Sequence, residues 1–114
     1  MKQKLISTLQ AFGFPVHLQG TMNAEESYPD TFITFWCNTT EDNLHFDNDV
    51  IAVDWSFSVM LYSNSPAIVN TMPKQIISAL KNAGFIVLGK GQDIASDEPT
   101  HTGWAIDCII TEKQ

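Results

Sequence analysis

Three residues in the second half of the sequence have side chains that could bind a metal ion. They are Asp97, Glu98 and His101. A catalytic metal usually needs three protein ligands in a fixed geometry, with one position left open for water or substrate. Pro99 separates the acidic pair from the histidine within a polar stretch, so we interpret the group as a solvated loop and predict no metal site.

A second group of acidic residues resembles part of a calcium-binding loop. Glu41-Asp42 is followed by Asp47-Asn48-Asp49. A calcium loop of the usual kind also has a glycine at its sharp turn and a closing glutamate at a fixed spacing. Both are missing here, so the sequence does not predict calcium binding.

The segment Gly89-Lys90-Gly91 follows a predicted strand, and a glycine-rich segment in that place can hold a phosphate group. Phosphate loops have a longer motif and a following helix whose N-terminus faces the anion. The sequence shows neither, so we predict that this segment forms a tight turn.

Nucleophilic catalysis is not indicated by the remaining reactive residues. Cys37 and Cys108 lie in apolar, strand-like segments and are expected to be buried, unpaired thiols. None of the three histidines stands in a recognisable motif with a serine or a cysteine. We therefore predict that the chain is not an enzyme and has no catalytic, cofactor-binding or metal-binding residues.

The charge of the chain restricts its partners. The 114 residues include 13 acidic and six basic ones, which gives a formal net charge of −7. Affinity for nucleic acid comes mainly from Lys and Arg, so specific nucleic-acid binding is not expected, and attraction to an anionic membrane is not expected either. No apolar run reaches the roughly 18 residues of a membrane span, and we expect a single domain over residues 1–114 that is made in the cytoplasm.

Apolar residues at helical spacing predict two helices. The first covers residues 2–12 and ends at Gly13, and the second begins at Ser65-Pro66 and ends at Gly84. Pro73 lies inside the second pattern, where it should kink the helix or delay the start of its regular part.

Alternating apolar residues and β-branched or aromatic composition predict five strands. They cover residues 14–18, 31–37, 50–62, 85–88 and 103–111. The polar stretches at 20–30, 38–49 and 89–102 are predicted to be loops.

The strand at 50–62 has the clearest pattern of two different faces. One face contains Val53, Trp55, Phe57, Val59 and Leu61. The other contains Asp54, Ser56, Ser58 and Tyr62, with Met60 as its apolar exception. One face of the sheet should therefore be buried, and the other should be solvated or covered by a partner.

Two stretches of the chain resemble each other at an offset of 71 positions. Residues 9–16 (LQAFGFPV) and residues 80–87 (LKNAGFIV) each end a helix with Gly and begin a strand with Phe. This is either a helix–strand–strand pseudo-repeat or a common way of ending a helix. In both cases the element order predicts an α+β fold, with two helices packed on one face of a mostly antiparallel sheet of four to five strands.

Several segments together resemble small proteins of the head–tail gene clusters of tailed phages and prophages of Gram-positive bacteria. The segments are residues 12–16 with Gly20, residues 28–36, residues 47–49 with the strand around Trp55, residues 83–87, and residues 96–103. The last of them (SDEPTHTG) is the most specific, and together the segments extend over nearly the whole chain.

The resemblance implies a tail-terminator-like fold and a structural role in head–tail joining, tail completion or tail termination. Members of such families assemble into rings, commonly hexamers and in some cases only on the tail, that contact the tail tube protein and the head connector. The implied location is the host cytoplasm during assembly and the virion afterwards. An acidic inner wall of such a ring would repel DNA and let it pass.

Two other hypotheses remain open at the level of the sequence. One is a small ligand-binding or regulatory module of ferredoxin-like shape, which would need a pocket with converging polar groups. The other is a metal-dependent hydrolase that uses Asp97, Glu98 and His101.

Overall fold

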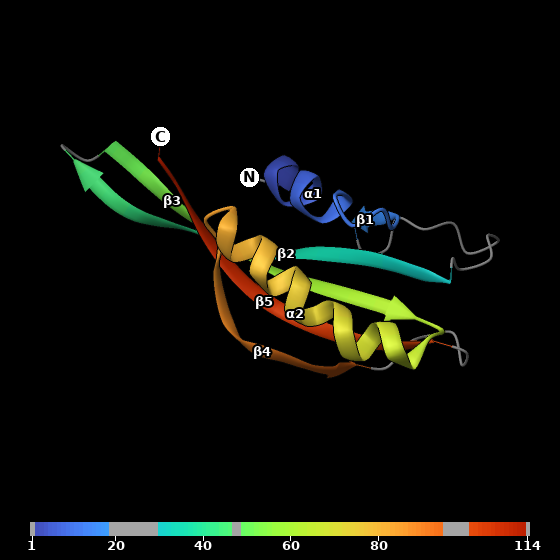
Figure 1. The fold of residues 1–114 in the computed structure, drawn as a ribbon. Coiled ribbons are helices and arrows are strands. Elements are labelled where there is room, and N and C mark those ends of the chain that lie inside the picture. The colour runs from blue at the N-terminus through green and yellow to red at the C-terminus, as the bar shows by residue number, and fades with distance from the viewer. Residues whose placement is uncertain (1, 19–29, 47–48, 95–100, 114) are drawn as a thin grey trace.

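The computed structural model describes residues 2–18, 30–46, 49–94 and 101–113. These residues form two helices and five strands (Figure 1). In chain order the elements are α1 (Lys2–Gln10), β1 (Val16–Leu18), β2 (Thr31–Phe46), β3 (Asp49–Ser63), α2 (Pro66–Asn82), β4 (Ile86–Ile94) and β5 (Thr102–Lys113).

The strands form one sheet in the order β1-β2-β3-β5-β4. β1 is parallel to β2, and every other neighbouring pair is antiparallel. Both helices pack on the same face of this sheet (Figure 1). The predicted α+β architecture, two helices on one face of a mostly antiparallel sheet, is therefore confirmed.

The hydrophobic core lies between the helices and the sheet. α1 contributes Leu5 and Leu9, and α2 contributes Ile76 and Leu80. The strands contribute the side chains that point toward the helices: Ile33, Phe35, Phe57, Val59, Leu61, Ile106, Cys108 and Ile110. The buried face predicted for the third strand is thus confirmed at Phe57, Val59 and Leu61, which are fully buried, whereas Val53 and Trp55 are only partly buried.

The predicted loop over residues 38–49 is wrong for the part that the structure describes. β2 continues to Phe46 and β3 begins at Asp49, and the two strands stay paired along this length. The backbone hydrogen bonds of the polar residues are satisfied by the neighbouring strand, so the segment does not need an apolar face to remain extended. Residues 38–41 are exposed, which explains their polar composition.

The predicted loop over residues 89–102 is also wrong in its first part. β4 continues past the glycines to Ile94 and pairs again with β5, after a shift of register between Leu88 and Gln92. The sequence predicted a turn here because glycine-rich segments are typical of turns, whereas the observed structure is an irregularity within a continuing strand. The predicted loop at 20–30 lies outside the described residues except for Asp30.

The predicted starts and ends of the helices are close to the observed ones. Ser65 is the N-cap of α2, and the helix begins at Pro66, well before Pro73. Pro73 therefore does not delay the start of the helix. α1 ends at Gln10, two residues earlier than predicted.

The end of α2 shows why a glycine is needed at this place. Gly84 has a φ of 98°, a left-handed conformation that other residues rarely adopt. The backbone N–H of Gly84 donates to the carbonyl of Lys81 over 3.1 Å, and that of Phe85 donates to the carbonyl of Leu80 over 2.9 Å. This pair of hydrogen bonds is the Schellman motif, and it turns the chain toward β4.

The two similar stretches of sequence share a helix ending but differ in strand pairing. Gly13, like Gly84, has a positive φ, here 83°. The strand that follows α1 pairs in parallel with β2, whereas the strand that follows α2 pairs antiparallel with β5. The similarity therefore corresponds to a shared local turn and not to a repeated arrangement of strands.

Candidate functional site

A pocket of about 380 Å³ lies between α2 and the β4–β5 edge of the sheet. Its lining residues are Val69, Asn70, Pro73, Lys74, Ile77, Lys81, Gly89, Lys90 and Trp104, and we call it the lysine pocket. The volume is near the lower end of the roughly 300–1,000 Å³ that is usual for ligand sites.

One wall of the lysine pocket is a stripe along α2. Asn70, Lys74, Ile77 and Lys81 follow one another at intervals of four, three and four residues. This spacing places them on the same side of a helix, one turn above the other. The two lysines are exposed, whereas Val69 and Pro73 beside them are buried. The wall is therefore apolar at its base and basic at its rim.

The opposite wall is built by the irregular part of β4. Gly89 and Gly91 have φ angles of 76° and 92°. The indole N–H of Trp104 donates to the carbonyl oxygen of Lys90 over 2.9 Å and fixes the backbone at this point. A Cβ atom on Gly91 would lie 2.2 Å from the indole nitrogen of Trp104, so only glycine allows this close approach.

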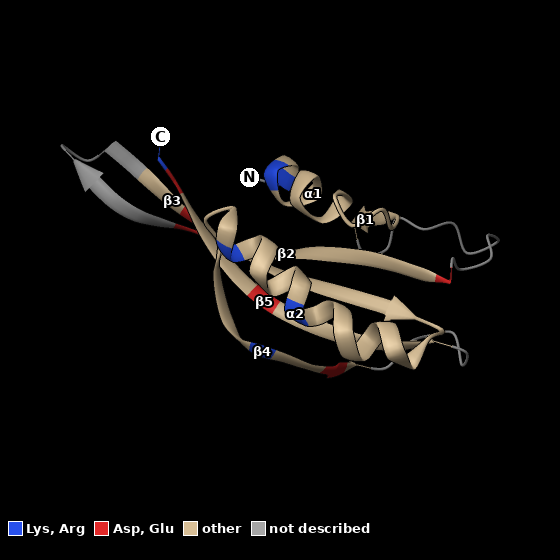
Figure 2. Ribbon diagram, in the orientation of Figure 1, with Lys and Arg blue, Asp and Glu red and all other residues tan. Residues whose placement is uncertain are grey.

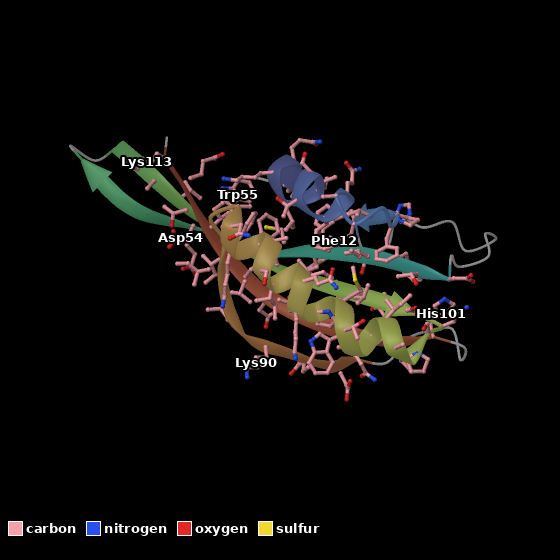
Figure 3. All side chains as sticks on the ribbon, in the orientation of Figure 1. Phe12, Asp54, Trp55, Lys90, His101 and Lys113 are labelled. Carbon is pink, nitrogen blue, oxygen red and sulfur yellow. The ribbon has the colours of Figure 1, made fainter. Side chains whose placement is uncertain are left out.

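The lysine pocket concentrates the positive charge of an acidic chain. The chain has six basic residues, all of them lysines, and three of the six line this pocket. None of the described residues that line it is acidic. Figure 2 shows the basic segments of α2 and β4 in blue, and Figure 3 shows Lys90 at the outer margin of β4.

The chemistry of the lysine pocket suits an anionic group that is attached to an apolar body. Lysine ammonium groups attract carboxylates and phosphates and can swing on flexible stems. The side chains of Ile77 and Trp104 offer apolar surface beside these cations. Sequence reasoning missed this site, although the spacing of Lys74 and Lys81 and the Gly-Lys-Gly segment are visible in the sequence.

The second candidate surface is the side of the sheet on which neither helix packs, which we call the helix-free face. The register places the following residues on it: Phe32, Thr34, Trp36, Ser56, Ser58, Met60, Tyr62, Ala105, Asp107, Ile109, Ile86 and Leu88. Trp36 is 50% exposed, Ile86 64% and Leu88 49%. Large apolar side chains therefore reach solvent at both edges of this face.

A polar row separates the two apolar edges of the helix-free face. The amide of Asn38 donates to the hydroxyl of Ser58 over 2.9 Å, and Ser58 donates to a carboxylate oxygen of Asp107 over 2.8 Å. Trp36 and Leu88 lie at the two ends of the same row. Ser58 is held between an amide and a carboxylate, an arrangement that orients the surface and does not activate a nucleophile.

The metal and calcium candidates of the sequence are only partly described. His101 is buried, and its ring lies 5.9 Å from that of Phe32, whereas Asp97 and Glu98 lie outside the described residues. Glu41 is exposed on β2, and Asp47 and Asn48 lie outside the described part. Within the part of the chain that the structure describes, no three His, Cys, Asp or Glu residues gather as metal ligands would.

The two cysteines are unpaired, as expected, but only Cys108 is buried, and Cys37 is partly exposed. Burial, together with the negative charge of Asp107, raises the pKa of Cys108 to about 12, so its thiol is protonated at neutral pH and is a poor nucleophile. Cys37 lies two strands away, because both cysteines are register partners of Phe57. Two strand spacings amount to about 10 Å, too far for a disulfide.

Comparisons with known proteins do not assign the chain to a family. No protein-family model matches it, and no curated protein matches it. Neither α1 nor α2, the helices of the described residues, is long and apolar enough to cross a membrane.

Proposed function

We propose that the chain is a structural subunit of the head–tail junction of a tailed phage or prophage. In this role it is a tail terminator or tail-completion protein that assembles into a ring. The proposal rests on the resemblance described above, on the two-helix α+β fold and on the surface of the sheet. Its partners are further copies of the chain, the tail tube protein and the head connector.

The main support is the exposed apolar surface of the helix-free face. Trp36, Ile86 and Leu88 are each about half exposed or more. Trp36 lies at one edge of this face, and Ile86 and Leu88 lie together at the other edge. Exposed apolar surface of this kind is typical of a contact with another protein. Trp is also among the residues enriched in the cores of such interfaces. In the proposed ring this face contacts the next component of the virion.

Assembly into a ring requires unlike surfaces on the two sides of each subunit. A head-to-tail contact of this kind gives a closed ring when the rotation between neighbouring subunits is a whole fraction of a full turn. The elongated subunit, with principal extents of 53 × 29 × 22 Å, can present such different surfaces on its sides. With a net charge of −7, the chain has enough acidic residues for an inner wall that repels DNA.

The proposal is tested by electron microscopy of phage particles that are produced without this chain. Loss of a tail terminator gives overlong tail tubes, and loss of a joining protein gives tubes of normal length that remain detached from heads. Complementation with the wild-type gene should restore particles, and complementation with an Ile86→Glu, Leu88→Glu variant should not. Normal, attached tails in the absence of the chain would contradict the proposal.

A second candidate function is a small ligand-binding module of ferredoxin-like shape. The lysine pocket favours it, because its three lysines and the Trp104 indole converge on one cavity. The particle experiment separates the two candidates, since a ligand-binding module has no reason to set the length or attachment of tails.

A further inference from the structure

Three lysines line the lysine pocket, and none of its described lining residues has a carboxylate. Lys74 and Lys81 are seven residues apart on α2, which corresponds to about 10 Å along the helix, and Lys90 lies on the opposite wall. All three side chains are exposed at the rim. Like charges that share one cavity repel each other, and a bound anion reduces that repulsion.

The charge along the lysine pocket has a direction. At the end near the start of α2, the pocket adjoins a smaller cavity of about 280 Å³, with which it shares Val69 and Asn70. Asp93 lines that second cavity. A carboxylate is repelled at this end and attracted at the end where Lys81 lies, so an anionic ligand should bind in one orientation.

The floor between these two ends is apolar, and part of it is fixed in place. Val69 and Pro73 are buried, and Ile77 and Trp104 are partly buried. The indole of Trp104 is held by the hydrogen bond that it donates to the carbonyl oxygen of Lys90. A ligand with an apolar body therefore gains by burying that body against a preformed wall, in addition to the attraction of its charge.

The size of the lysine pocket suits a small molecule. The volume of about 380 Å³ has room for roughly a dozen non-hydrogen atoms, if each occupies about as much space as one water molecule in the liquid. A Cβ atom on Gly89 would meet no other atom within 4 Å, so the wall is open at this residue. The pocket can therefore hold a carboxylate together with a short apolar chain or ring.

We propose that the lysine pocket binds a small carboxylic acid with about ten non-hydrogen atoms, such as a medium-chain fatty acid. The carboxylate lies among the three lysines, and the apolar body lies along Ile77 and Trp104 toward Val69. The inference rests on the second candidate function, whose ligand class it names. It goes beyond the proposed structural role, which does not use this pocket.

The test is an NMR titration of the full chain with octanoate at low salt. Acetate and 1-octanol serve as comparison ligands, because the first keeps only the carboxylate and the second keeps only the apolar body. Octanoate should bind with a Kd of roughly 0.1–1 mM, and each comparison ligand at least about 10-fold more weakly. The indole N–H signal of Trp104 should shift, whereas those of Trp36 and Trp55, which do not line the pocket, should not.

The contribution of the lysines is tested with two triple variants. The pocket variant contains Lys74→Gln, Lys81→Gln and Lys90→Gln. The matched control replaces the three lysines outside the pocket and has the same net charge: Lys2→Gln, Lys4→Gln and Lys113→Gln. The pocket variant should bind octanoate about 10-fold more weakly than the control does. Circular dichroism shows whether both variants are folded.

The orientation of the ligand is tested with Asp93→Asn. This change removes the repulsion at one end of the pocket, so octanoate should bind about 2- to 3-fold more tightly, with a larger gain at low salt. Asp107→Asn, on the helix-free face, changes the net charge equally and should leave the Kd unchanged. Weaker binding by Asp93→Asn would contradict the orientation.

Three outcomes overturn the inference. The first is a Trp104 signal that does not move up to about 10 mM octanoate, roughly ten times the weakest expected Kd. The second is acetate or 1-octanol that binds as tightly as octanoate, and the third is a pocket variant that binds as tightly as the control. The proposed structural role survives each of them, because the length and attachment of tails in the particle experiment test it independently.

Discussion

The two faces of the sheet differ although they are built from alternate residues of the same strands. On the face toward the helices, Phe57, Val59 and Leu61 are fully buried in an apolar core. On the helix-free face, a hydrogen-bonded row through Ser58 and Asp107 separates apolar edges that reach solvent. The first face forms the core. On the second, Phe32 and Met60 are buried, and the apolar side chains that are available for contacts with other molecules lie at its edges.

The largest expected difference between the two faces is in the stability lost when a leucine on each of them is replaced by alanine. Leu61→Ala removes a fully buried side chain and should lower the free energy of unfolding by about 2–5 kcal/mol. Leu88→Ala, at a side chain that is 49% exposed, should cost about 1 kcal/mol or less. Urea unfolding measures both, and equal losses would show that the helix-free face is packed as tightly as the core.

A smaller effect is expected from the polar row of the helix-free face. Ser58→Ala removes the hydroxyl that links Asn38 to Asp107. Both partners are exposed and can bind water instead, so the loss of stability should be about 0.5–1.5 kcal/mol. Ser56→Ala, at the next position on the same face, is the control. A loss well above this range in urea unfolding would mean that the row supports the fold.

The smallest effect on stability is expected at the exposed edge. Ile86→Thr keeps a β-branched side chain at a position that is 64% exposed, so the free energy of unfolding should change by no more than about 0.5 kcal/mol. Thermal unfolding of the variant and the wild type measures this change. A loss above about 1 kcal/mol would indicate that Ile86 contributes to packing, and the contrast between the faces would then be weaker.

The architecture could be predicted from the sequence because it depends on local periodicity. The spacing of apolar residues indicated both helices, and Gly13 and Gly84 indicated where their chains turn. The alternation around Phe57 indicated which side of the central strand is buried. Each of these signals lies within a few neighbouring residues.

The lengths of the strands could not be predicted in the same way. The second half of β2 is polar except for Leu44 and Phe46 near its end, and it is extended because β3 pairs with it. The irregular part of β4 depends on the contact of Gly91 with Trp104, which is 13 residues away in the sequence. Polar strand segments and glycines within strands therefore give no local sequence signal from which the length of a strand could be predicted.

The lysine pocket was missed for a related reason. Lys74 and Lys81 lie on α2 and Lys90 lies on β4, and only the turn at Gly84 brings these elements side by side. A sequence shows which residues are basic, but their gathering on one cavity depends on the packing of a helix against a strand. The helix-free face was anticipated better, because the alternation of β3 already indicated two unlike sides.

The position of β5 has a consequence for the order of folding. This strand follows the other four in the chain, yet it lies between β3 and β4. During synthesis from the N-terminus, β4 therefore has no strand beside it until residues 102–113 have left the ribosome. The β2–β3 hairpin can form early from local contacts, whereas the sheet closes in a late step of high contact order.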